Sequence, residues 1–171
     1  HEEGTKIFRF KEVDNLEEDY VGRYDVLEKY GFSRFDKFLE LHASNFFEIS
    51  EDGNLGINSI EDDFKKISEH IIENSPEVRA VVGHSWLMDT PLASRLGFNK
   101  VEEKSDDDLN NFSSWFQFID KNGEISKPRL DKLILKGEIP YKSSLAYIKT
   151  EDFLARYLPA EKKGDINLKK L

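Results

Sequence analysis

The segment His84-Ser85-Trp86-Leu87-Met88-Asp89 places three side chains that can take part in acyl or proton transfer close together. A serine, a histidine and a carboxylate are the parts of a nucleophilic triad. The spacing argues against a triad, because the adjacent strand residues His84 and Ser85 point to opposite faces, and no Gly-x-Ser-x-Gly turn surrounds the serine. The chemistry that remains for this segment is proton transfer or substrate binding.

His84 is the strongest single candidate for a general base or a substrate contact. It follows the apolar run of residues 78 to 83, and open α/β sheets place ligand crevices at the carboxyl ends of their strands. The competing interpretation is a structural histidine whose ring satisfies a loop carbonyl.

Ser85, Trp86 and Asp89 are expected to bind substrate beside His84. Each also has a structural role that competes with this one. Trp86 is large and apolar enough to anchor the loop in the core, and Asp89 precedes Thr90-Pro91, where a carboxylate can cap a helix.

No metal site is predicted. His42, His70 and His84 are scattered along the chain, and none forms an i, i+4 pair with another. The acidic run Asp106-Asp107-Asp108 lacks the alternating ligands and the closing glutamate of a calcium loop, so we expect a solvated hairpin tip there.

Composition limits which partners these residues can serve. The chain has 171 residues, which predicts one domain over residues 1 to 160 with a loosely attached tail over residues 161 to 171. It has no cysteine, which excludes disulfides and thiolate chemistry and suggests a reducing, cytoplasmic location. A net charge of −9 disfavours nucleic acid and anionic membranes, and no apolar run approaches the ~20 residues of a membrane span. The expected partner is a small-molecule substrate or a basic protein.

The elements that would position the candidate residues alternate between strands and helices. Apolar runs and period-two alternation predict strands over residues 5–13, 45–50, 78–83, 98–104, 113–119 and 144–148. Helical spacing with caps and glycine stops predicts helices over residues 14–30, 33–43, 59–74, 90–97, 126–137 and 150–158. This order indicates an α/β (mixed α+β) fold, with a mixed central sheet, helices on both faces and an N-terminal helical pair.

Two motifs in the middle of the chain resemble a known family. Residues 92 to 101, Leu-Ala-Ser-Arg-Leu-Gly-Phe-Asn-Lys-Val, resemble the helix-to-strand junction of the GNAT acetyltransferase superfamily. Residues 84 to 92, His-Ser-Trp-Leu-Met-Asp-Thr-Pro-Leu, resemble a more specific block in the GNAT-like C-terminal domains of a bacterial acyltransferase-related family. The resemblance is strongest over residues 44 to 148, and it implies a GNAT-like sheet with acetyl-CoA or another acyl-CoA as the acyl donor.

The sequence departs from this family where the pyrophosphate of coenzyme A would bind. By the resemblance, that site is the start of the long helix, at Asn58, Ser59 and Ile60. The turn over residues 53 to 59 lacks the family's glycine spacing and its basic residue. We also expect Glu61-Asp62-Asp63 to fill the first helical turn, where a phosphate would meet like charges.

A second departure concerns the leaving group. Many of these enzymes use a tyrosine just before the Leu-Gly-Phe junction to reprotonate the departing thiolate, and here that position is Ala93, which transfers no proton. We therefore expect an acyltransferase-related domain that transfers an acyl group to a small amine or hydroxyl, with an altered or lost coenzyme A site. The alternative is a non-catalytic binding or interaction module that kept the fold.

Overall fold

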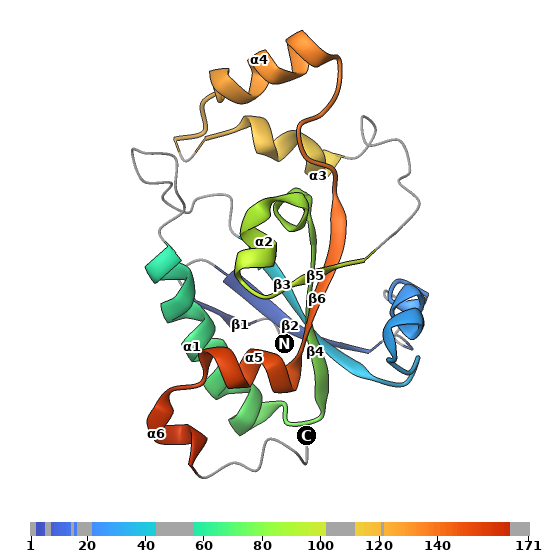
Figure 1. The fold of residues 1–171 in the computed structure, drawn as a ribbon, viewed down its shortest axis with the longest axis vertical. Helices are drawn as coiled ribbons and strands as arrows, with labels where there is room; N and C mark the ends of the chain where they lie inside the picture. The colour runs from blue at the N-terminus through green and yellow to red at the C-terminus, as the bar shows by residue number, and fades with distance from the viewer. Residues whose placement is uncertain are drawn as a thin grey trace.

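The computed structural model describes residues 3–5, 8–14, 16, 22–43, 57–101, 112–120 and 122–164. Its strands form one sheet in the order β1-β2-β3-β4-β6-β5 (Figure 1). The strands are β1 (Glu3–Gly4), β2 (Phe8–Asp14), β3 (Lys37–Ala43), β4 (Val78–Ser85), β5 (Asn99–Lys100) and β6 (Ser144–Lys149).

The sheet mixes parallel and antiparallel pairs. β3 and β4 run parallel, and every other neighbouring pair is antiparallel. Parallel neighbours need a crossover, which here contains the long helix α1 (Ile57–Asn74). A mixed sheet with helices packed against it confirms the predicted fold class.

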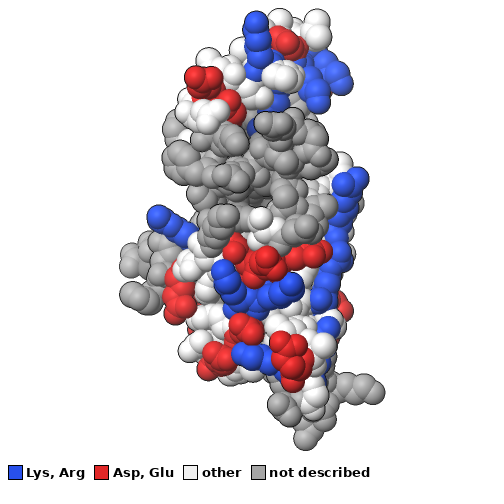
Figure 2. Space-filling view, turned by 90° about the vertical axis from the view of Figure 1, so that its left-hand side faces the viewer, with Lys and Arg blue, Asp and Glu red and all other residues white. Residues whose placement is uncertain are grey.

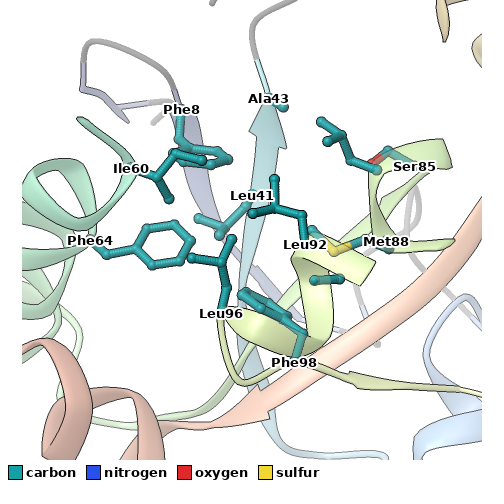
Figure 3. A pocket seen from close by; sticks show the side chains of 12 residues that line it. Phe8, Leu41, Ala43, Ile60, Phe64, Ser85, Met88, Leu92, Leu96 and Phe98 are labelled. Atoms are coloured by element: carbon teal, nitrogen blue, oxygen red, sulfur yellow. The ribbon is translucent and has the colours of Figure 1, made fainter. Parts of the chain in front are cut away.

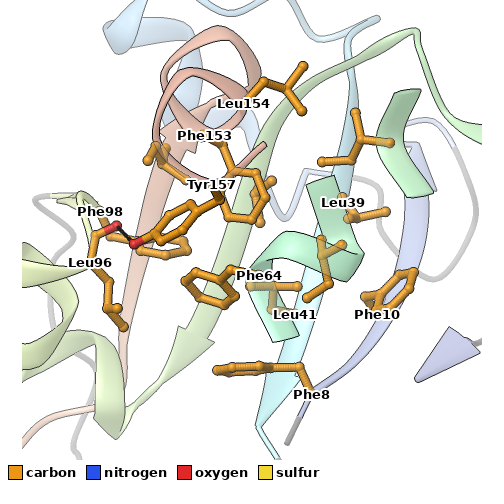
Figure 4. Close-up of a cluster of buried hydrophobic side chains, with 14 of the residues drawn as sticks. Phe8, Phe10, Leu39, Leu41, Phe64, Leu96, Phe98, Phe153, Leu154 and Tyr157 are labelled. Atoms are coloured by element: carbon orange, nitrogen blue, oxygen red, sulfur yellow. Dashed lines mark hydrogen bonds between the residues drawn. The ribbon is translucent and has the colours of Figure 1, made fainter. Parts of the chain in front are cut away.

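Helices cover both faces of the sheet. α1, α2 (Pro91–Arg95) and α5 (Thr150–Tyr157) pack on one face, and the 3-10 helix η1 (Asp25–Tyr30) packs on the other (Figure 1). Phe64 lies at the centre of the hydrophobic core between the sheet and α1, α2 and α5. Its ring is 4.9 Å from that of Tyr157 and 5.2 Å from that of Phe153 (Figure 4). The Tyr157 hydroxyl donates to the Leu96 carbonyl at 2.8 Å, which fastens α5 to the end of α2.

A small helical unit extends beyond one end of the sheet (Figure 1). It consists of α3 (Phe112–Trp115), the 3-10 turn η4 (Phe116–Phe118) and α4 (Lys127–Lys136). Gln117 joins it to the chain that enters β6, because its buried amide donates to the Tyr141 carbonyl at 2.9 Å and accepts from the Tyr141 N–H at 3.1 Å.

The C-terminal helix α6 (Ala160–Lys163) lies against α1. Lys162 forms ion pairs with Glu69 at 3.2 Å and with Glu73 at 3.1 Å. On the side of the molecule seen in Figure 2, basic and acidic side chains are interleaved among the described residues. None of the described helices is long and apolar enough to cross a membrane.

One of the two predicted N-terminal helices is wrong. Most of residues 33 to 43 form the strand β3 instead of a helix. Phe38 and Leu39 are both buried, in the cores on opposite faces of the sheet, so the central strand lacks the polar alternation that identifies a strand. Of the predicted helix over residues 14 to 30, the described part contains only the short turn η1.

The strand predicted over residues 113 to 119 is also wrong, because α3 and η4 occupy it. The buried Gln117 is satisfied by hydrogen bonds to Ser114 and Tyr141, which an alternating pattern does not reveal. Of the strand predicted over residues 98 to 104, the described part contains β5 alone, and the strand predicted over residues 45 to 50 lies outside the described residues.

Candidate functional site

The sheet opens between its two parallel strands. The described ladder between β3 and β4 ends at the pair Leu41–Gly83, although both strands continue for two more residues. Beyond this point β3 stays bonded to β2, as far as the pair Ala43–Phe8, and β4 stays bonded to β6. The carboxyl ends of the parallel strands therefore separate, which is where open α/β sheets place their ligands.

An apolar pocket occupies this opening on the α1 face of the sheet (Figure 3). It encloses about 490 Å³ of space between atoms, part of it open solvent. Its lining comes from β2, β3, α1, β4 and the segment from residue 87 to residue 98: Phe8, Leu41, Ala43, Ile60, Phe64, Ser85, Leu87, Met88, Leu92, Ala93, Leu96 and Phe98.

Met88 sits directly over the backbone of Gly83 at the opening. A Cβ atom at position 83 would lie 2.2 Å from the Met88 Cε, so only glycine leaves room for the thioether in this position. Met88 belongs to the 3-10 turn η2 (Trp86–Asp89) and is half-buried. Because methionine is unbranched and flexible, it is the lining side chain best able to move for a ligand.

The structure separates the two polar candidates of the strand. Ser85 lies in the pocket wall, whereas the exposed His84 shares the opposite face with Val82 and with its cross-strand partner Leu145. The predicted division of His84 and Ser85 between the two faces is thus confirmed. His84 can reach a reacting group only through the opening or around its rim.

Trp86 lies at the junction with the helical unit rather than in the pocket lining. Its ring stacks on that of Tyr141, with centroids 6.2 Å apart, and the Arg129 guanidinium lies 5.3 Å from its centroid. Arg129 also donates to the Gln117 carbonyl at 2.6 Å. These contacts hold the helical unit against η2.

The expected helix cap at Asp89 is wrong. The Asp89 carboxylate accepts from the Lys142 backbone N–H at 2.7 Å and forms an ion pair with Lys100, so it ties together the segments on either side of the helical unit. Thr90 precedes Pro91 at the start of α2, and its hydroxyl donates to the Leu87 carbonyl at 2.7 Å. The turn before α2 is thus closed by the Thr90 hydroxyl and not by the Asp89 carboxylate.

The residues proposed for coenzyme A lie in the first turn of α1. Ser59 is exposed, and Ile60 is buried with its side chain in the pocket lining. The backbone of Asn58 belongs to the same turn.

The expectation that acidic residues fill that turn is wrong. The helix begins at Ile57, so Glu61, Asp62 and Asp63 lie in its second turn. Asp62 forms an ion pair with Lys65 at 3.1 Å, and the buried Asp63 accepts from the Thr5 hydroxyl at 2.6 Å. The carboxylates of Asp62 and Asp63 therefore already have partners within the protein.

Sequence reasoning missed a buried carboxylate on the η1 face of β3. Glu40 is 1% exposed, with Arg23 at 3.2 Å and His42 at 3.3 Å from its oxygens. Burial raises the pKa of Glu40, but the neighbouring His42, the charge of Arg23 and the Tyr24 hydroxyl outweigh it and hold the pKa below its ordinary value. The signal available in the sequence was a glutamate between two buried leucines, Leu39 and Leu41.

Two further residues limit the chemistry. Ala93, in the pocket wall, offers no proton to a leaving group. Burial raises the pKa of Tyr157 to about 12, and its hydroxyl donates to the Leu96 carbonyl, so this tyrosine is poorly suited to proton transfer. Among the described residues, no group of three or more His, Asp or Glu side chains could hold a metal ion.

Comparisons with known proteins address the fold. No protein-family model matches the sequence, and no curated protein gives a significant match. Among solved structures, the chain is similar to an acyltransferase crystallised in complex with decanoyl-CoA, with a TM-score of 0.52 and 16% sequence identity. The match covers 92% of this chain and 46% of that one, so this chain spans about half the length of that protein. The fold is therefore acyltransferase-like.

Proposed function

We propose that this chain is an acyltransferase-related domain of the GNAT-like kind, and that the pocket between β3 and β4 receives the acyl chain of an acyl-CoA. The observation that carries the proposal is an apolar pocket where the ladder between the parallel strands ends, at Leu41–Gly83. An alkyl chain gains about 0.8 kcal/mol for each CH2 group that it buries, so this lining favours an acyl chain over a polar ligand. The acyltransferase-like fold, shared with a protein crystallised with decanoyl-CoA, supports the same ligand class.

Ile60 connects the pocket to the start of α1. Its side chain lines the pocket, and its backbone belongs to the first helical turn together with Asn58 and Ser59. The N–H groups of a helix start have no partner within the helix and favour anions. We propose that this turn receives the pyrophosphate, with Glu61 and the following carboxylates weakening the contact from the next turn.

Acyl transfer joins a small amine or hydroxyl to the thioester carbonyl carbon and releases the coenzyme A thiol. The Ser85 hydroxyl is the polar group of the pocket lining and would contact the thioester end of the chain. His84 is the candidate that the sequence offers for taking the acceptor's proton from the opposite face.

Calorimetry with decanoyl-CoA, decanoate and coenzyme A tests this function. We expect decanoyl-CoA to bind most tightly, because it alone uses both the pocket and the helix start. Replacing Ala43 at the pocket mouth with phenylalanine should weaken decanoyl-CoA and decanoate alike, since the ring would enter the pocket (Figure 3). The matched control is Ala155→Phe, on the exposed side of α5. Decanoyl-CoA that binds Ala43→Phe as tightly as the wild type would place the ligand elsewhere.

The non-catalytic alternative is favoured by one observation. Ala93 stands in the pocket wall where the resembled enzymes have their acid, and no titratable side chain lines the pocket among the described residues. Under this alternative the domain binds an acyl-CoA or another apolar ligand without releasing thiol. Release is measured with a thiol reagent, and the protein gives no background because it has no cysteine.

A further inference from the structure

Glu40 and His42 form a polar pair at the end of β3, on the face of the sheet opposite the acyl pocket. They are two residues apart in a strand, so both side chains point to the η1 side, while Leu41 and Ala43 point into the pocket. Burying a carboxylate is costly unless it is paired and hydrogen-bonded. Neither Glu40 oxygen has a hydrogen-bond partner among the described residues, so the compensation comes from the charge of Arg23 at 3.2 Å and from His42, whose Nε2 lies 3.3 Å from the Glu40 Oε2.

The pair lies at the rim of the opening. His42 follows Leu41, the last β3 residue in the ladder with β4, and His84 follows its partner Gly83 in the same way. Both imidazoles therefore flank the point where the strands separate, on the face away from the acyl chain. The side chain of His42 is half exposed, whereas Glu40 is buried behind it.

Cationic groups surround the pair on this face. From β2, Arg9 lies across from His42 and Lys11 lies across from Glu40. Arg23 adds a positive charge from the segment before η1, and His84 adds a titratable ring from β4. An acceptor that carries a carboxylate of its own suits these surroundings better than a purely cationic amine.

We propose that His42, held in place by Glu40, takes the proton of the acyl acceptor, which reaches the thioester through the opening from the η1 face. The inference rests on the proposed function, gives the role of proton acceptor to His42 in place of His84, and adds Glu40 as a positioning residue. The Nε2 of His42 lies 3.3 Å from the Glu40 Oε2, which leaves Nδ1 as the ring atom for the acceptor.

The step balances without any further reactant. The acceptor's nitrogen or oxygen forms a bond to the thioester carbonyl carbon, and the Nδ1 of His42 takes its proton. The carbon–sulfur bond then breaks, the electron pair leaves with the thiolate, and His42 returns the proton to that sulfur. His42 thus supplies the acid that Ala93 lacks.

The test measures thiol release from decanoyl-CoA by the 171-residue chain, with water and with glycine as acceptors, beside calorimetric binding of decanoyl-CoA. We expect His42→Gln to lower kcat about a hundredfold with either acceptor, while decanoyl-CoA binds as before. Glu40→Gln should lower kcat with little change in KM, and Glu40→Asp should restore part of the rate, which a purely structural role would not produce. His70→Gln is the matched control, because His70 belongs to α1 and its ring packs on Phe10, on the face of the sheet opposite His42.

The outcomes separate the inference from the function on which it rests. If decanoyl-CoA does not bind, the proposed function fails. If it binds but the wild type releases no thiol above the uncatalysed rate, or if His42→Gln releases thiol at the wild-type rate, the inference is overturned. A loss of rate in His84→Gln with none in His42→Gln would move the proton acceptor to β4 and likewise overturn it.

Discussion

Replacing Met88 with alanine should lengthen the acyl chain that the pocket accepts. The Met88 thioether lies over Gly83 at the opening, with its Cε 2.2 Å from where a Cβ at position 83 would stand. Met88 therefore occupies space at the opening that a long acyl chain would need. Met88→Ala removes three heavy atoms from this position permanently.

The size of the effect follows from the buried chain length. Each additional CH2 group that the enlarged pocket buries contributes about 0.8 kcal/mol, which is about a fourfold gain in affinity. Two further CH2 groups, about the length removed from Met88, would give about fifteenfold. The variant should also be less stable by about 1–2 kcal/mol, below the usual range for a fully buried methionine because Met88 is half-buried.

Calorimetry with octanoyl-, decanoyl-, dodecanoyl- and tetradecanoyl-CoA measures this prediction. In the wild type we expect the affinity to rise with each added pair of carbons up to a limiting chain length. We expect this limit to be longer in Met88→Ala. Met88→Leu conserves the volume and serves as the control that should leave the limit in place. The same limit in the wild type and in Met88→Ala would show that the chain does not reach Met88, and would refute the assignment of the pocket.

Three other measurements test the contacts that shape the site. Tyr157→Phe removes the hydrogen bond to Leu96 and should lower the free energy of unfolding by about 1 kcal/mol in urea titrations, with no change in decanoyl-CoA binding. The lowered pKa of Glu40 stabilises the fold fully above the reference value of 4.5 and is lost as the pH falls through the folded value, so Glu40→Gln should flatten the acid side of the stability curve. Trp86→Ala should loosen the helical unit, seen as faster amide exchange in α3 and α4, because it removes the surface on which Tyr141 and Arg129 pack.

The sequence identified those elements whose ends carry local signals. α1 and α2 were predicted within two residues at their starts, because a stripe of apolar residues and the Thr90-Pro91 start are readable without tertiary context. β3 was not, because both faces of a central strand are buried and its apolar residues also fit a helical spacing. Only its pairing with β2 and β4 shows that this segment is a strand and not a helix.

That one misassignment also concealed the polar pair. In a helix, residues two apart such as Glu40 and His42 point in different directions, so no contact between them is expected. In a strand they share a face, and their oxygens and nitrogens come within 3.3 Å. The candidates His84 and Ser85 were found because their strand was recognised. The side chains of Trp86 and Asp89, which were predicted to bind substrate, instead contact the helical unit and the segments beside it.

If the proposed function holds, the parallel pair of strands accounts for how a single opening would serve both the acyl chain and the acceptor. At the point of separation each strand contributes one residue to each face: Ala43 and Ser85 to the apolar side, and His42 and His84 to the polar side. Acyl transfer needs this division, because the chain must be buried away from water while the acceptor must reach a proton acceptor from water. A shift of one residue in either strand would turn its histidine to the apolar side and its small residue to the polar side. The register Leu41–Gly83 therefore specifies the site as much as any side chain does.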